Sequence, residues 1–157
     1  MDGVSSRGIA PVVAVVLVVV CTIGLSVGVV AISGSIGSPS APPQAILSGT
    51  ADASTGVITI SHDGGEALDV DSLALVVAID GDELAHQPPV PFFSSDGFAP
   101  GPTGAFNVAS DRTLTAGETA SFGLASSNDP TLESGSVVRI RVFYEETMLL
   151  TIEFTAD

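Results

Sequence analysis

The chain contains no lysine and no tryptophan, and it has only one cysteine and one tyrosine among its 157 residues. Four arginines stand against 18 acidic residues, which gives a formal net charge of -14. A chain so poor in cations cannot neutralise a phosphate backbone, so nucleic acid is excluded as a partner. A single cysteine excludes a disulfide within the chain, and the cysteine content therefore does not indicate a redox compartment.

Apart from Asp2, the acidic residues are dispersed from Asp52 to Asp157, so they do not form the single run that marks a disordered acidic tail. Their mutual repulsion weakens when the Debye length falls to about 3 Å near 1 M salt. The absence of lysine together with dispersed carboxylates therefore predicts an environment of high ionic strength.

Motifs for catalysis are also lacking. The sequence has no Gly-x-Ser-x-Gly, no phosphate-binding loop and no His-Glu-x-x-His. We expect His62 at a strand end and His86 in a loop. These observations predict that the protein is not an enzyme and that it uses no cofactor.

Two groups of carboxylates come close together in the sequence. Neither has the spacing of an EF-hand loop, so a solvated acidic face is favoured over a calcium site, and no metal site is predicted. The two groups of carboxylates are Asp63, Glu66, Asp69 and Asp71, and Asp80, Asp82 and Glu83.

Asn107 and Asn128 are not followed by Ser or Thr two positions later, so N-glycosylation is not predicted.

The longest hydrophobic run extends from Ile9 to Ile32 and carries no charge. At about 1.5 Å per residue these residues form a helix of about 36 Å, enough to cross a hydrocarbon core of about 30 Å. We therefore predict a hydrophobic transmembrane or filament-core α-helix over residues 9–33.

Three interpretations of residues 1–36 compete. A cleavable secretory signal has an apolar core of about 7–15 residues with a cut after it, but this run is longer and a proline-rich stretch follows it. An uncleaved signal anchor would keep Arg7 inside the cell and place the acidic remainder outside. The third interpretation places the cut before the helix.

The third interpretation depends on Arg7-Gly8-Ile9-Ala10, which resembles the class III signal of archaeal type IV pilin-like proteins. The resemblance implies a processing site between Gly8 and Ile9, a leader over residues 1–8, and a mature protein that retains the whole helix. The following Pro11-Val12-Val13-Ala14-Val15-Val16-Leu17 resembles the helix start of archaeal type IV pilins. Archaellins usually lack this proline, so a pilin is favoured over an archaellin.

Small residues within the apolar run favour close helix packing. Gly24 and Gly28 form a Gly-x-x-x-Gly pair that lets backbones approach, although small residues are common in membrane helices generally. Pro11 falls in the first turn, where its missing N–H costs nothing. Cys21 follows Val20, whereas a lipid-attachment cysteine needs a small residue before it, so we expect an inert helix cysteine.

After a Pro/Gly/Ser-rich linker over residues 34–43, the hydrophobic period changes to 2 over residues 44–157. This pattern predicts a head domain that is an antiparallel, immunoglobulin-like β-sandwich without helix. Turns are predicted at Asp63-Gly64-Gly65, Asp80-Gly81-Asp82 and Glu145-Glu146. Strands are predicted over Val57–His62, Leu73–Ile79, Thr119–Leu124, Val137–Tyr144 and Thr147–Phe154. The last two strands form a hairpin. In its first strand, one face carries Val138, Ile140, Val142 and Tyr144, and the other carries Arg139 and Arg141.

A proline- and phenylalanine-rich segment over residues 88–102 interrupts the strand pattern. Its five prolines exclude a central strand, so it is predicted to be a long loop. Two roles remain open for Phe92, Phe93 and Phe98: they cap the core of the head, or they contact another molecule.

The pattern from Thr59 to Val70, followed later by Leu114-Thr115-Ala116-Gly117-Glu118, resembles the heads of pilin-like proteins from halophilic archaea. With the leader, the resemblance implies a structural subunit of a type IV pilus-like surface filament with a role in adhesion. It also implies as partners a prepilin peptidase, an assembly ATPase with its membrane platform, the membrane and other pilin subunits. Two alternatives stay open: a membrane-anchored extracellular binding module that does not polymerise, and a minor pilin that primes or tips a filament.

Overall fold

The computed structural model describes residues 14–17 and 41–157. Residues 14–17 form one turn of α-helix, and the rest of the predicted helix lies outside the described residues. Residues 41–157 make a compact unit with its own hydrophobic core. This unit is mainly β-structure, and every pair of its strands is antiparallel, as predicted.

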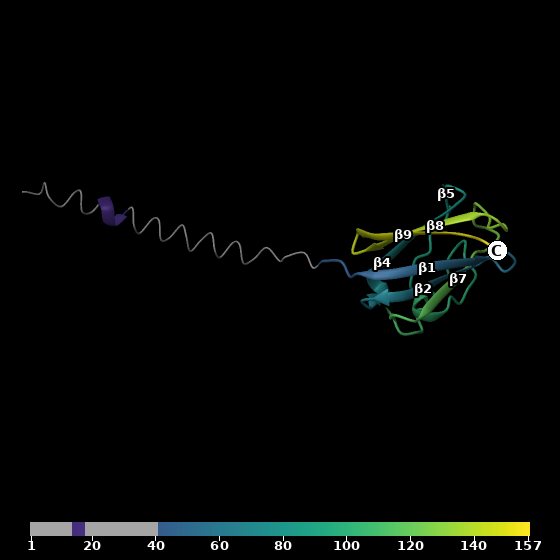
Figure 1. Ribbon diagram of the computed structural model, residues 1–157, viewed down its shortest axis with the longest axis horizontal. Helices are drawn as coiled ribbons and strands as arrows, with labels where there is room; N and C mark the ends of the chain where they lie inside the picture. Colours follow the sequence, from purple (N-terminus) through teal and green to yellow (C-terminus); the bar gives the residue numbers. More distant parts are fainter. Residues whose placement is uncertain (1–13, 18–40) are drawn as a thin grey trace, which may run out of the picture. The chain divides into compact units, whose positions relative to one another are not determined.

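Two larger sheets provide the framework of this unit (Figure 1). One sheet has the order β1-β2-β7 and the other β5-β4-β8-β9, while β3 and β6 pair separately. The strand bounds are β1 Ala45–Asp52, β2 Val57–Gly65, β3 Leu68–Asp69, β4 Leu73–Ile79, β5 Asp82–Glu83, β6 Thr113–Leu114, β7 Thr119–Gly123, β8 Val137–Tyr144 and β9 Thr147–Thr155.

Side chains from both sheets enter a single core. The apolar residues alternate along each strand, and this alternation places one face of each sheet inward. In β8 the inward residues Val138, Ile140 and Val142 are fully buried, and Tyr144 is half-buried. The predicted face of this hairpin is therefore confirmed, and the other fully buried large side chains include Ile58 and Ile60 of β2, Val77 and Ile79 of β4, Phe122 of β7 and Phe106.

The outer face of β8 carries two ion pairs. Arg139 pairs with Glu153 of β9, with Nη2 and Oε2 2.8 Å apart, and Arg141 pairs with Glu83 of β5. Each pair joins β8 to a neighbouring element of its sheet. Because all four side chains remain substantially exposed, each pair contributes little stability, about 0–1 kcal/mol.

The proline-rich segment covers the free edge of β7. Ala99 donates its N–H to the carbonyl of Gly123 at 2.8 Å, and Thr103 donates to Ser121 at 2.9 Å. Between these two donors, Gly101 donates its N–H to the carbonyl of Phe93 at 2.7 Å, within the segment itself. The segment thus satisfies part of the sheet edge at β7, and its prolines have no N–H to offer to a further strand.

A side chain completes the edge of β4 where β5 ends. The amide of Gln87 accepts from the N–H of Val77 at 2.7 Å and donates to the carbonyls of Val77 and Leu84 at 3.0 Å. Gln87 therefore substitutes for a paired strand at a position where Pro88 prevents the chain from continuing as one. Nothing in the period-2 pattern indicates this role.

Three sequence predictions for the head are corrected. The turn predicted at Asp63-Gly64-Gly65 is wrong, because β2 runs through to Gly65 and pairs Gly64 and Gly65 with the start of β1. The expectation of no helix is wrong in detail, since single 3₁₀ turns occupy Val70–Ser72 and Gly104–Phe106. Strand β1 is missing from the predicted strands: its small and polar residues give a weak alternation, and pairing with β2 decides its conformation.

Candidate functional site

The residues to which the sequence assigns a function lie outside the described part of the chain. These are the predicted processing residues Arg7, Gly8, Ile9 and Ala10 and the predicted packing residues Pro11, Gly24 and Gly28. Cys21 also lies outside it. In the described residues, 14–17 and 41–157, no helix is long and apolar enough to span a bilayer.

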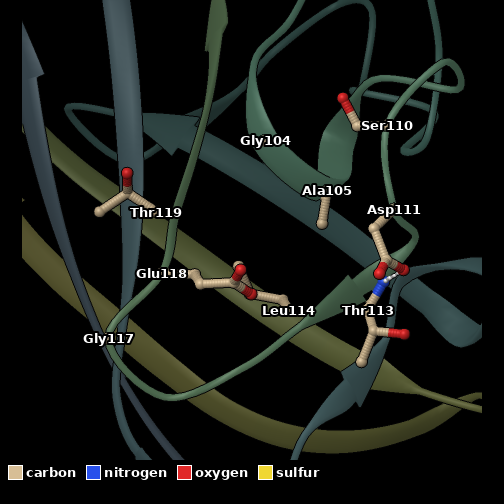
Figure 2. Close-up of a pocket in the computed structure, with 9 residues that line it drawn as sticks. All are labelled: Gly104, Ala105, Ser110, Asp111, Thr113, Leu114, Gly117, Glu118 and Thr119. Carbon is tan, nitrogen blue, oxygen red and sulfur yellow. Dashed lines mark hydrogen bonds between the residues drawn. The ribbon is translucent and has the colours of Figure 1, made fainter.

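A polar pocket of about 350 Å³ lies between the 3₁₀ turn at Gly104–Phe106, strand β6 and the start of β7 (Figure 2). Figure 2 shows two carboxylates, Asp111 and Glu118, reaching it from different segments. The pocket is lined by Gly104, Ala105, Ser110, Asp111, Thr113, Leu114, Gly117, Glu118 and Thr119.

Both carboxylates bind the turns on which they lie. Asp111 accepts from the N–H of Thr113 at 3.2 Å. Glu118 accepts from the N–H of Thr115 at 2.8 Å and from its hydroxyl at 2.9 Å. The hydrogen bonds from Thr115 hold the pKa of Glu118 below its ordinary value, so this carboxylate is a turn acceptor rather than a proton donor at neutral pH.

His62 lies in β2 near this pocket but is buried, only 1% exposed. The Nε2 atom is 2.8 Å from the carbonyl oxygen of Glu66, so Nε2 carries the proton and donates it. The Nδ1 atom has no hydrogen-bond partner in the described part of the chain. The prediction that His62 stands at a strand end is corrected, because β2 continues to Gly65 and the His62 side chain is buried in the core.

The carboxylates singled out in the sequence bind different partners within the head. Asp69 accepts from the N–H of Asp71 at 3.0 Å, and Asp71 pairs with Arg112 at 2.9 Å. Asp80 accepts from the hydroxyl of Ser136 and the N–H of Val137, both at 2.8 Å. Within residues 14–17 and 41–157, no three His, Cys, Asp or Glu side chains are grouped to hold a metal ion.

Because Asp80 accepts hydrogen bonds as a carboxylate, the stability of the head is expected to fall at acid pH. Backbone and side-chain donors hold the pKa of Asp80 below its ordinary 3.8, mainly through the N–H of Val137. A carboxylate whose folded pKa is lowered stabilises the fold above its unfolded pKa, and this contribution is lost as pH falls through the folded pKa. We expect Asp80→Asn to lower the urea midpoint at pH 7, with the difference from wild type shrinking below about pH 4.

Asparagine suits this test because Asp80 has a positive φ of 53°, which asparagine tolerates well. The substitution therefore removes the charge while retaining the backbone. Asp96→Asn, at an exposed position, is the control. A loss at Asp80 that is equal at pH 7 and pH 2.5 would show that the charge is not the cause.

The two open roles of the phenylalanines are divided between different residues. Phe92 and Phe98 are buried, and their ring centroids lie 5.6 Å apart, while Phe98 and Phe122 lie 5.7 Å apart. Core capping is therefore confirmed for Phe92 and Phe98. Phe93 is 60% exposed, so the prediction of contact with another molecule stays open for that residue.

Asn128 holds this loop in place, and sequence reasoning missed it. It is buried, accepts from the N–H of His86 at 3.0 Å and donates to the carbonyls of His86 and Gly97. The sequence drew attention to Asn128 only as a residue without a glycosylation signal. Its neighbours Ser126, Ser127 and Asp129 suggest an ordinary polar loop, so no local signal marks its buried position.

No protein-family model matches the chain, and no curated protein matches its sequence. A function for this protein is therefore inferred from its own residues.

Proposed function

We propose that the chain is a structural pilin subunit of a type IV pilus-like surface filament of the archaeal type, with a role in adhesion. The observation that carries the proposal is the motif Arg7-Gly8-Ile9-Ala10, placed directly before the uncharged run from Ile9 to Ile32. A cut at this motif leaves the entire apolar helix at the start of the mature protein. Such a helix needs apolar cover on every side, which lipid provides before assembly and sister helices provide in a filament.

The proposed mature protein has three parts. The hydrophobic helix over residues 9–33 builds the assembly, and the linker over residues 34–43 separates it from the head. The head is an antiparallel β-sandwich of immunoglobulin-like architecture, supported by two sheets that share one core. Its partners are other pilin subunits, a prepilin peptidase, an assembly ATPase with its platform, and the membrane.

The surface of the head supports a role outside the cell in concentrated salt. The arginines of residues 41–157, which are Arg112, Arg139 and Arg141, all pair with acidic side chains. Most of the remaining carboxylates are exposed, so the surface is strongly anionic. Several of these carboxylates accept hydrogen bonds from turn N–H groups, which suits a structural role better than a catalytic one.

The first test is the N-terminus of the membrane-extracted protein. We expect Edman sequencing or mass spectrometry to give a mature start at Ile9. Gly8→Val is expected to abolish processing, because a β-branched side chain replaces the small residue before the cut. Gly3→Val, at the other glycine of the leader, is the control and should be processed normally.

Other outcomes separate the alternatives. A start at Met1 or Asp2 would contradict the pilin proposal and favour a membrane-anchored module that does not polymerise. Normal processing of Gly8→Val would disprove the assigned cut site. A start at Ile9 with the protein present in filaments only at trace levels would indicate a minor pilin.

A further inference from the structure

A second pocket lies past the end of β1, at the end of the head that carries the C-terminus (Figure 1). It has a volume of about 260 Å³ and is lined by the turn between β1 and β2 and by two stretches of the loop between β7 and β8. None of the lining side chains is charged, although the chain carries 18 acidic residues. We call the hollow between residues 54–56 and residues 124–132 the end pocket.

Hydroxyl groups come to the end pocket from separate segments. Ser54 and Thr55 lie in the turn between β1 and β2, and Ser126 and Thr131 lie in the loop before β8. All four residues are exposed. A hydroxyl both donates and accepts hydrogen bonds, so this lining matches a ligand that presents several hydroxyls of its own.

The end pocket also has apolar lining residues. Leu124, Pro130 and Leu132 are half-buried and contribute to its wall. Small-molecule sites are typically lined by apolar side chains together with a few polar groups that fix the orientation of the ligand. A sugar ring has the same mixture of groups, because its C–H groups are apolar and its rim carries hydroxyls.

Hydrogen bonds within the head hold these walls in place. Ser54 donates its N–H to Oδ1 of Asp52 at 2.8 Å, and Leu124 donates its N–H to the carbonyl of Gly56 at 2.8 Å. The buried amide of Asn128, which forms a further part of the wall, is fixed by the backbone groups described above. A preformed wall needs little ordering on binding, so less of the binding free energy is lost.

We infer that the end pocket binds a single uncharged sugar ring. Its volume lies just below the range of about 300–1,000 Å³ that is usual for small-molecule sites, which suits one ring rather than a large cofactor. No lining side chain is cationic, so the carboxylate of an acidic sugar would be desolvated without a partner. The use of this binding in adhesion rests on the proposed function, because many weak sites on one filament would act together.

Other ligand classes match the end pocket less well. Peptides are commonly captured through backbone hydrogen bonds, but the N–H groups of Leu124, Ala125 and Asn128 are already bound within the head. A metal cation such as calcium prefers carboxylate oxygens, and the lining contains no carboxylate.

Saturation-transfer NMR on the full-length protein in molar salt tests the inference. The detergent must have no sugar headgroup, so that the micelle itself cannot occupy the pocket. The probes are the methyl glycosides of glucose, galactose, mannose and N-acetylglucosamine. We expect at least one of them to bind with a dissociation constant on the order of 1–10 mM, as for other ligands of this size.

The matching uronide, with a carboxylate at C6 of the same ring, should bind about tenfold more weakly than the best neutral probe. Equal binding of the two would overturn the inference, and so would the absence of binding by all four neutral probes. A neutral serine tripeptide that binds as tightly as the best sugar would show that the pocket takes peptides instead.

Two variants locate the binding. Thr131→Val retains the shape of the side chain without its hydroxyl, and Ser126→Ala removes the second loop hydroxyl. Each should weaken binding about threefold to tenfold, since one neutral hydrogen bond is lost, and should leave the melting temperature unchanged because both residues are exposed. Thr147→Val and Ser94→Ala, at exposed positions outside the lining, are the matched controls.

Unchanged binding in both pocket variants, or an equal loss in the controls, would overturn the inference. These outcomes leave the proposed function intact, because a mature start at Ile9 does not depend on the end pocket. An unprocessed wild-type chain would contradict the proposed function, whereas sugar binding by the head would still be measured.

Discussion

Replacing Gly65 with alanine is expected to lower the free energy of unfolding of residues 41–157 by about 3–4 kcal/mol. Two effects add at this position. Gly65 has a φ of 104°, which is unfavourable for any residue with a β-carbon. A β-carbon would also collide with the carbonyl oxygen of Gln44, which accepts the N–H of Glu66 at 2.7 Å. The end of β2 would therefore separate from the start of β1.

Gly81→Ala is a matched control, because Gly81 has nearly the same φ, 101°, and no heavy atom lies within 4 Å of the point that its β-carbon would occupy. This variant should lose only the backbone contribution, about 1–2 kcal/mol. Urea unfolding in molar salt, followed by far-UV circular dichroism, gives both values. Equal losses of unfolding free energy for Gly65→Ala and Gly81→Ala would show that the backbone at Gln44 moves away from the added β-carbon without cost.

Phe98→Ala is expected to lower the free energy of unfolding by about 3–5 kcal/mol. Phe98 is 4% exposed, and its ring makes edge contacts with Phe92 and Phe122. Phe122 in turn lies 6.1 Å from Phe106, measured between ring centroids. Removing the Phe98 ring would leave a cavity that joins the loop to the core, so the loop and the sheets would lose stability together.

Phe93→Ala tests the same loop without a cavity, since Phe93 is largely exposed. Its unfolding free energy should remain within about 0.5 kcal/mol of wild type. The two variants should be compared in the same urea series, with hydrogen exchange at Ala99 and Thr103 as a local readout of the loop. A small loss for Phe98→Ala would mean that the loop caps the head without stabilising it.

Strands with strong alternation were predictable from sequence. The bounds predicted for Leu73–Ile79 and Val137–Tyr144 are those of β4 and β8, and the predicted turn at Asp80-Gly81-Asp82 is confirmed by positive φ at Asp80 and Gly81. Each of these segments buries one face, so the local pattern and the tertiary environment favour the same conformation.

Positions decided by a distant partner were not predictable. The Asp63-Gly64-Gly65 sequence favours a turn locally, yet β1 supplies partners that extend the strand through it. Gln87 and Asn128 bind backbone groups that are 10 and 42 residues away in sequence. Hydrogen-bond partners at such separations leave no periodic signal near the residue that binds them.

The sequence by itself determined the uncharged run from Ile9 to Ile32, the motif before it, the acidic composition and the antiparallel β-character of the head. These features depend on composition and on the short-range period of apolar residues. Only the tertiary structure decided that Phe98 is buried while Phe93 is exposed, and that carboxylates close in sequence serve separate turns. The physical reason is that burial and proximity arise when segments far apart in the chain pack together.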